Sequence, residues 1–174
     1  MKKIYIIQSH SGTIPSELIR LFTKNNYTHI SISLDKKMKK MYSFGRRKLN
    51  NVLNSGFIIE SIDGDFYQKF NKTKCKVFEL KITYIQYCHL KSMLKKYEKD
   101  PLKYNYDILG LLIKKLNIQF KRKNRFVCSQ FVGYLLEKSN IYKFSKDVYH
   151  IVPSDFNSIS PNIIYEGLLK DCKY

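Results

Sequence analysis

The stretch FVCSQFVGYLLE, Phe126–Glu137, predicts a helix that carries a cysteine in its first turn. Its large apolar residues recur on one face of that helix, which we expect to be buried: Phe131, Val132, Leu135 and Leu136. Cys128 precedes this face, at the end where the helix dipole lowers the pKa of a thiol. The thiolate is the form that attacks a carbonyl carbon, so the pattern predicts that Cys128 is a nucleophile.

The other three cysteines have ordinary settings. Cys75 opens an expected strand, Cys88 lies in the middle of an expected helix, and Cys172 lies in the tail. None of the four cysteines forms a C-x-x-C pair, and no histidine stands at zinc-ligand spacing from them, so no metal or cofactor is expected.

A thiol nucleophile needs a base, and the sequence favours His29 for this role. The segment YTHISISL, Tyr27–Leu34, alternates as a half-buried strand does, with its isoleucines and Leu34 on one face. His29 shares the other face with Ser31 and Ser33, and we expect that small polar face to line a cleft. The remaining histidines have weaker settings: His10 in a loop, His89 within a helix and His150 in a loop.

A base histidine needs a group that orients its second nitrogen. The sequence offers Ser43 and Tyr42 on the next expected strand and Glu60 on the strand after it. Glu60 has the best chemistry, whereas Ser43 lies on the strand expected to adjoin His29. The sequence leaves the choice among the three open.

Strands dominate the first half of the chain and helices the second, which predicts one α+β domain spanning residues 1–174. The expected strands are Ile4–Gln8, His29–Leu34, Met41–Arg46, Gly56–Ile62, Val77–Ile82 and Ile163–Tyr165. The expected helices run from Thr13 or Ser16 to Lys24, over Tyr84–Glu98, over Tyr106–Leu116, from Cys128 to Glu137 or Lys138, and briefly within Val152–Phe156. Core candidates on the second of these helices are Ile85, Leu90, Met93, Leu94 and Tyr97.

The order of the two site residues, histidine first and cysteine last, resembles the circularly permuted papain-like hydrolases. These form the permuted branch of the NlpC-type cysteine peptidases and include the YiiX-like proteins. Four local patterns carry the resemblance: THISI at Thr28–Ile32, FVCSQFV at Phe126–Val132, VPSDF at Val152–Phe156, and YSFGR at Tyr42–Arg46, the last as in YiiX-like proteins of low-GC Gram-positive bacteria.

The resemblance implies a circularly permuted papain-like fold, in which an antiparallel sheet packs against helices. It implies that Cys128 is the nucleophile and His29 its base. By position the residue that orients His29 would be Ser43. A glutamate is common at this place in relatives, so Glu60 is the alternative candidate.

The expected function is a cysteine hydrolase that cleaves an amide bond in a cell-wall-type peptide, a γ-glutamyl or an isopeptide linkage. One alternative is a thioesterase or acyltransferase that acts on lipids, because the last step of the same chemistry differs only in the acceptor. Another is a non-catalytic basic protein that binds nucleic acid through its 14 tyrosines and 11 phenylalanines, although no recognised nucleic-acid motif is present.

The formal net charge of +18 would attract an anionic polymer or a membrane surface. The lysines are dispersed, however, and their mixture with Ile, Asn and Tyr is also what an AT-rich genome produces. The densest run, Lys121–Arg125, precedes Cys128 and would favour its thiolate. The N-terminal apolar stretch is too short for a signal peptide, and no apolar run has the length of a membrane span, so a cytoplasmic protein is expected.

Overall fold

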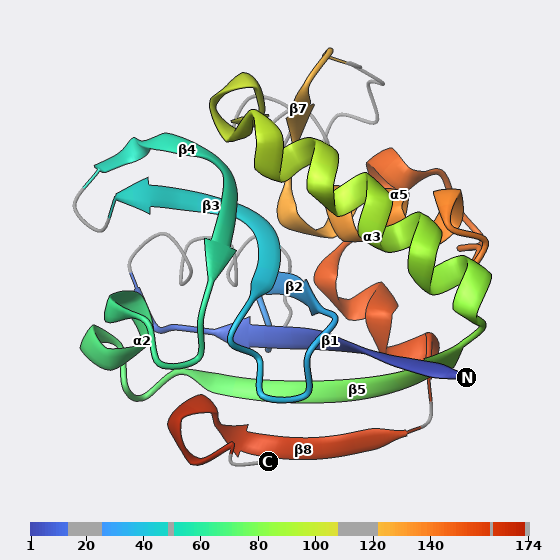
Figure 1. The fold of residues 1–174 in the computed structure, drawn as a ribbon. Coiled ribbons are helices and arrows are strands. Elements are labelled where there is room, and N and C mark those ends of the chain that lie inside the picture. The colour runs from blue at the N-terminus through green and yellow to red at the C-terminus, as the bar shows by residue number, and fades with distance from the viewer. Residues whose placement is uncertain (14–25, 49–50, 108–121, 161, 173–174) are drawn as a thin grey trace.

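One eight-stranded sheet organises the described part of the chain (Figure 1). The computed structural model describes residues 1–13, 26–48, 51–107, 122–160 and 162–172. The strands are β1 Lys2–His10, β2 His29–Ser33, β3 Met41–Lys48, β4 Asn51–Glu60, β5 Lys74–Ile82, β6 Asn105–Tyr106, β7 Arg125–Phe126 and β8 Ile163–Leu168. Their order in the sheet is β7-β6-β4-β3-β2-β1-β5-β8, and every neighbouring pair is antiparallel except β6 with β7. The α+β class is therefore confirmed.

Strand β1 lies inside the sheet and is buried on both faces. It pairs with β2 from Tyr5↔Ser33 to Ser9↔His29, and with β5 along its whole length. Six consecutive residues, from Ile4 to Ser9, are buried. Such a continuous buried run is typical of a strand that is covered on both sides.

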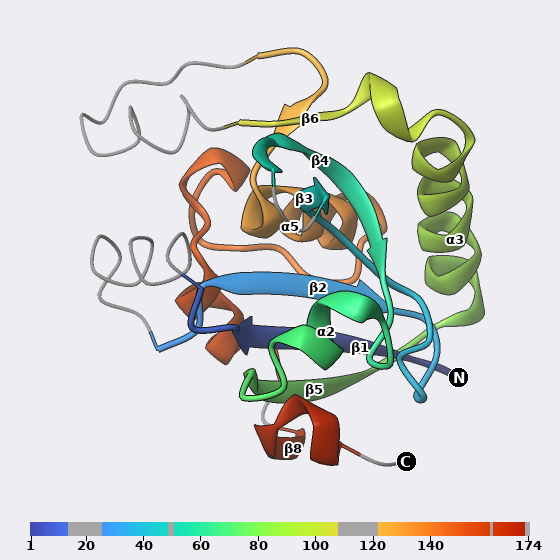
Figure 2. The same cartoon turned by 90° about the vertical axis from the view of Figure 1, so that its left-hand side faces the viewer.

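Two longer helices, α3 Tyr84–Lys99 and α5 Cys128–Lys138, pack against one face of the sheet, and the short helix α2 Asp65–Lys69 packs against the other (Figure 2). Helix α3 begins with a capping box, in which Thr83 and Gln86 each accept a hydrogen bond from the other's backbone N–H. The 3-10 helices are η1 Pro101–Lys103, η3 Val148–His150, η4 Pro153–Ser158 and η5 Leu169–Asp171. None of the helices in the described ranges is long and apolar enough to cross a membrane.

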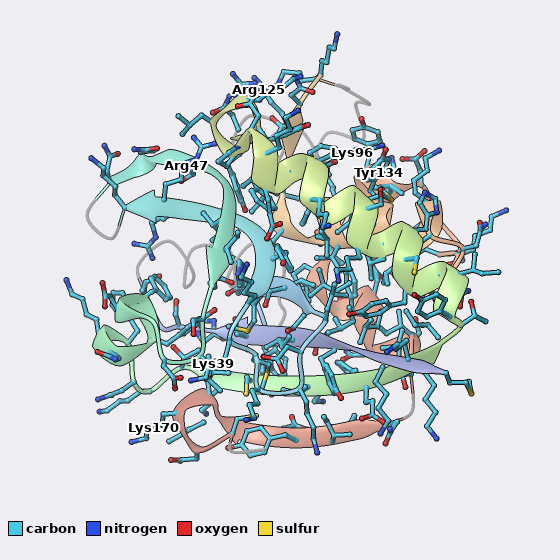
Figure 3. All side chains as sticks on the ribbon, in the orientation of Figure 1. Lys39, Arg47, Lys96, Arg125, Tyr134 and Lys170 are labelled. Carbon is cyan, nitrogen blue, oxygen red and sulfur yellow. The ribbon has the colours of Figure 1, made fainter. Side chains whose placement is uncertain are left out.

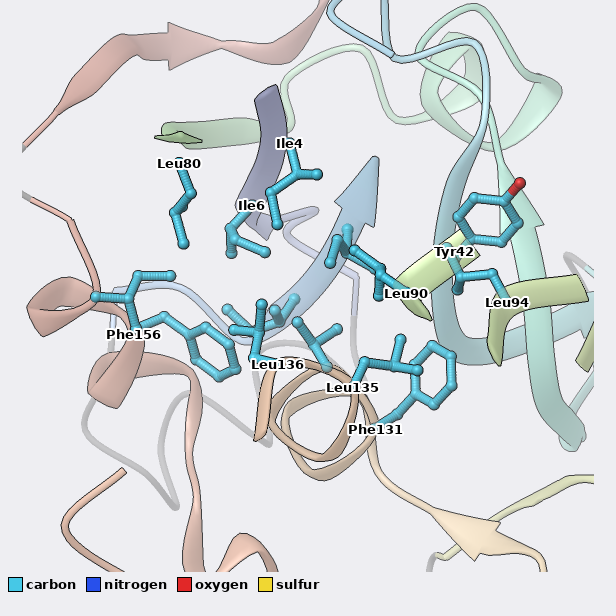
Figure 4. Close-up of a cluster of buried hydrophobic side chains, with 14 of the residues drawn as sticks. Ile4, Ile6, Tyr42, Leu80, Leu90, Leu94, Phe131, Leu135, Leu136 and Phe156 are labelled. Atoms are coloured by element: carbon cyan, nitrogen blue, oxygen red, sulfur yellow. The ribbon is translucent and has the colours of Figure 1, made fainter. Parts of the chain in front are cut away.

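The main hydrophobic core fills the space between the sheet and the helices α3 and α5 (Figure 4). Ile4 and Ile6 of β1 meet Leu135 and Leu136 of α5 in this core. Phe131 lies among several aromatic rings, with ring centroids 4.9–6.2 Å away: Phe44, Phe57, Tyr97 and Phe126. The buried face predicted for α5 is therefore confirmed.

A second core covers the opposite face of the sheet. It is built from residues that alternate with those of the main core along the strands, together with α2 and η5: Tyr5, Ile7, Met38, Met41, Tyr67, Cys75, Val77, Leu169 and Cys172. Ser31 and Ser33 are fully buried on this side. The sequence predicts that His29, Ser31 and Ser33 line an open cleft. This is wrong for Ser31 and Ser33, because the second core covers both serines.

Most expected elements are present, and most of the expected strands are longer than predicted, whereas β2 ends one residue earlier, at Ser33. The two short strands β6 and β7 were not predicted. The helix expected over Tyr106–Leu116 is wrong at its start, because Tyr106 lies in β6, and residues 108–116 lie outside the described part of the chain. The helix expected to end at Lys24 also lies outside it, apart from Thr13, which is not helical. The turn expected at residues 63–65 leads directly into α2, which was not predicted. Within α3, Ile85 is 81% exposed rather than buried.

Replacing Phe131 by alanine should lower the free energy of unfolding by about 3–5 kcal/mol, because it empties the centre of the aromatic cluster. Ile85→Ala, on the exposed face of α3, should change it by less than about 0.5 kcal/mol. Urea denaturation followed by circular dichroism measures both. Equal losses in the two variants would contradict the core described here.

Candidate active site

The site lies where β2 and β3 part. The two strands pair only at Ile32↔Tyr42 and Ser33↔Met41, whereas β2 remains paired with β1 as far as His29. From Ile32 back to His29, the backbone groups of β2 that point towards β3 therefore need other hydrogen-bond partners. Ser43 supplies one, because its hydroxyl donates to the carbonyl of Ile30 at 2.6 Å.

The first turn of α5 supplies the other partner. The backbone N–H of Ile30 donates to Sγ of Cys128, and so does the N–H of Ser129 within the helix itself. The sulfur also lies 4.0 Å from the carbonyl oxygen of Thr28. Cys128 is only 4% exposed, so its sulfur is buried beside the start of β2.

Side-chain hydrogen bonds hold this turn of α5 against the segment that follows the helix. Ser129 donates to the carbonyl of Ile151 at 2.7 Å, and Nε2 of Gln130 donates to the carbonyl of Tyr149 at 3.1 Å. From β1, Nε2 of Gln8 donates to the carbonyl of Pro153 at 2.8 Å. These bonds fix the position of the cysteine relative to β1 and β2.

His29 bridges the thiol and a carboxylate. Its Nε2 lies 3.0 Å from Oε2 of Glu60, and a second hydrogen bond joins the imidazole to Sγ of Cys128. The side chains of His29 and Glu60 are 22% and 12% exposed, so the pair is largely shielded while the imidazole keeps some access to solvent. The structure thus brings together a thiol, an imidazole and a carboxylate that lie far apart in the sequence.

Two tyrosines extend this hydrogen-bonded chain at its ends. The hydroxyl of Tyr67, on α2, bonds to Glu60 and to Ser9. The hydroxyl of Tyr106, on β6, bonds to Sγ of Cys128. Burial raises the pKa of each phenol, and the neighbouring Glu60 or Cys128 raises it further, so both hydroxyls stay protonated and can donate. Neither residue was predicted, because no local pattern marks a tyrosine that reaches this site from another element.

The protonation of the central pair follows from these contacts. Burial favours the neutral form of each group, but the carboxylate of Glu60 and the hydrogen bonds to Cys128 and Glu60 outweigh it and raise the pKa of His29 well above its usual value. Burial likewise raises the pKa of Cys128, but His29 and the N–H groups of Ile30 and Ser129 lower it by more. The geometry therefore favours a thiolate–imidazolium pair.

A glycine makes room for the imidazole. A Cβ added to Gly45 of β3 would lie 2.7 Å from Cδ1 of Ile58 and 3.6 Å from Cε1 of His29. A Cβ at this position would therefore force the end of the Ile58 side chain on β4 to move, and would touch the ring of His29 at an ordinary contact distance.

The structure places the other candidate residues elsewhere. Ser43 is bonded to Ile30, and the hydroxyl of Tyr42 donates to Glu98 of α3 at 3.0 Å, so of the three orienting candidates it is Glu60 that reaches His29. His10 bonds to Thr28 through its Nδ1, at 3.3 Å. The causes that lower the pKa of the thiol are His29 and the N–H groups of Ile30 and Ser129, and the expected help from the run at 121–125 stays a prediction.

The remaining cysteines differ from Cys128 in their surroundings. Cys75 and Cys172 are buried together, and their mutual hydrogen bond and burial raise the pKa of Cys75. Cys88 is exposed on α3. In the described part of the chain, no group of three or more His, Cys, Asp or Glu side chains is placed to hold a metal ion.

Comparison with known proteins adds no relative. No family model matches the chain, and no match was found among curated proteins or among solved structures. The interpretation of the site therefore rests on its geometry and chemistry.

Replacing Glu60 by glutamine should lower the pKa of His29, because the carboxylate is a main cause of its rise. A weaker imidazolium lowers the pKa of Cys128 less, and we expect alkylation of Cys128 near pH 6 to slow by about tenfold for each unit by which the pKa of the thiol rises. Ser43→Ala should instead lower the free energy of unfolding by about 1–3 kcal/mol, through the stranded carbonyl of Ile30, and leave the alkylation rate unchanged. If Ser43→Ala slowed alkylation as much as Glu60→Gln, the assignment of the two roles would be wrong.

Alkylation of Cys128 should also show an unusual pH profile. Its thiolate is retained above a lowered pKa and is lost only as the pH falls through that value, whereas a free thiol loses its thiolate below about pH 8.5. Iodoacetamide labelling read by peptide mass spectrometry near pH 6 should therefore modify Cys128 faster than Cys75, Cys88 or Cys172. A rate no faster than that of Cys75 or Cys88 would refute an activated thiol.

Proposed function

We propose that this chain is a cysteine hydrolase that cleaves an amide bond through a thioester on Cys128. The observation that carries the proposal is the hydrogen-bonded sequence of Cys128, His29 and Glu60 at the start of α5. A thiol, an imidazole and a carboxylate in this order are the parts of a nucleophilic triad.

The reaction follows from the protonation of the pair. The thiolate of Cys128 attacks the amide carbon, and the carbonyl oxygen becomes an oxyanion. The imidazolium of His29 gives its proton to the leaving amine as the C–N bond breaks, which leaves a thioester and a neutral imidazole. His29 then takes a proton from water, the resulting hydroxide attacks the thioester, and the acid leaves as Cys128 is regenerated.

Two donors are placed to stabilise the oxyanion. The backbone N–H of Cys128 lies at the start of α5, where N–H groups have no partner within the helix. The hydroxyl of Tyr106 already bonds to Sγ and stays protonated. Both donors therefore lie next to the sulfur to which the reacting carbonyl would add.

The proposed function includes a specific fold, the circularly permuted papain-like fold. A mostly antiparallel sheet, a helix that begins with the nucleophile and a base on a strand that precedes it in sequence support a circularly permuted papain-like fold. The bonds that such an enzyme would cleave are those expected from the sequence: a cell-wall-type peptide, a γ-glutamyl or an isopeptide linkage.

Trapping the acyl-enzyme tests this function. The protein is mixed with a pool of muropeptides and with γ-glutamyl and isopeptide anilides, quenched in acid and examined by mass spectrometry. We expect an acyl adduct on Cys128 that hydroxylamine removes, and a loss of turnover of about a thousandfold or more in Cys128→Ala and in His29→Ala.

Cys88→Ala is the matched control, because it removes an exposed thiol outside the site and should leave turnover unchanged. Turnover that survives in Cys128→Ala would refute the proposed function. So would an acyl adduct on Cys88 instead of Cys128.

A further inference from the structure

An open hollow lies beside the candidate active site, where β1 ends and β5 begins. Its volume is about 1030 Å³, and it is bordered by the end of α2, the segment before β2 and the end of β8. Three of its lining residues are lysines that lie close together in the chain: Lys69, Lys72 and Lys74. His10, Tyr27 and Phe70 also line it.

The hollow carries net positive charge. Lys69, Lys72 and Lys74 form no ion pair with a carboxylate in the described ranges of the chain. The acidic residue of the lining, Glu166, is already neutralised, because Lys76 lies 3.2 Å from its carboxylate and the hydroxyl of Tyr27 donates to it at 2.9 Å. Three lysines thus line a concave surface whose own acidic residue is already paired.

This concentration differs from the rest of the basic surface. Lys39, Arg47, Lys96, Arg125 and Lys170 lie on separate elements of the fold (Figure 3). Lys39 is paired with Asp63, and Arg47 donates to the carbonyl of Tyr104. Other lysines gather too, as Lys91, Lys95 and Lys99 do along α3, but the three lysines of the hollow line a concave surface.

The hollow reaches the candidate site through the start of β2. His10, in its lining, bonds to the hydroxyl of Thr28, and the carbonyl of the same Thr28 lies 4.0 Å from Sγ of Cys128. Ser9, the residue before His10, pairs with His29. The end of β1 and the start of β2 lie on the same side of the molecule (Figure 2). Thr28 thus lies between the lining of the hollow and the sulfur of Cys128, and a substrate whose phosphate is held in the hollow would extend past this residue to the thiol.

We propose that this hollow binds a phosphate group carried by the acyl substrate of Cys128. A phosphate carries up to two negative charges and several acceptor oxygens, which suits three ammonium groups better than a singly charged carboxylate does. The proposal rests on the proposed function, because it assigns the substrate to the same thiol. The phosphate belongs to a soluble substrate or to a lipid headgroup, which share this chemistry.

Two alkylating reagents that differ only in the phosphate test the proposal. One is N-bromoacetyl-ethanolamine, and the other is its phosphate ester; with each, the thiolate of Cys128 displaces bromide and forms a thioether. We expect the phosphate ester to react with Cys128 about tenfold faster at subsaturating concentration. This preference should vanish in the hollow triple variant, Lys69→Gln with Lys72→Gln and Lys74→Gln.

The matched control removes three exposed lysines from α3, on another side of the molecule: Lys91→Gln with Lys95→Gln and Lys99→Gln. It changes the net charge by the same amount and should keep the preference. Equal loss in both triple variants would overturn the proposal in favour of a general field effect, and so would equal rates for the two reagents on the native protein. If neither reagent modified Cys128, the proposed function itself would fail.

Direct binding tests the hollow without the thiol. Binding is measured by calorimetry with tripolyphosphate and by sedimentation with phosphatidic acid vesicles, with phosphatidylcholine vesicles as the uncharged control. We expect affinity for at least one of the two phosphates, which the hollow triple variant loses by about tenfold and the α3 triple variant keeps. Binding to phosphatidic acid vesicles alone would identify a lipid headgroup, and binding to tripolyphosphate alone a soluble phosphate. Absence of both, or binding that the hollow triple variant retains, would overturn the proposal.

Discussion

The separation of β2 from β3 is the constraint on which the site depends. Backbone groups inside a protein need hydrogen-bond partners, and at Ile30 the neighbouring strand no longer provides them. The hydroxyl of Ser43 donates a hydrogen bond to the carbonyl of Ile30, and the sulfur of Cys128 accepts one from the N–H of Ile30. The same gap therefore explains why a serine lies on β3 and why the first turn of α5 docks here, with its thiol beside the imidazole of His29.

Burying an ionic pair is costly unless both partners are fully hydrogen-bonded. In the pair formed by Cys128 and His29, the imidazole is hydrogen-bonded to the carboxylate of Glu60. The sulfur accepts hydrogen bonds from two backbone N–H groups and from Tyr106. Tyr67 in turn anchors Glu60 from the second core. Both cores of the protein thus contribute to the site, which lies where the sheet opens between them.

The sequence predicted the parts that local pattern controls. The alternation around His29 and the apolar face of α5 follow from side-chain periodicity, and both were confirmed together with the α+β class. The covered serines of β2 and the exposed Ile85 were missed, because their burial depends on which distant elements pack against them. The choice between Ser43 and Glu60 was left open for the same reason, since only the strand separation shows which side chain reaches His29.

The most direct test is a spectroscopic titration of the Cys128 thiolate. The ultraviolet absorbance of thiolate is measured against pH for the native protein and for Cys128→Ser, and the difference isolates this one sulfur. A thiolate–imidazolium pair predicts a midpoint below that of an ordinary thiol, about 8.5, which rises when Glu60 is replaced by glutamine. A midpoint at or above 8.5, unchanged in Glu60→Gln, would contradict the pair and the proposed chemistry with it.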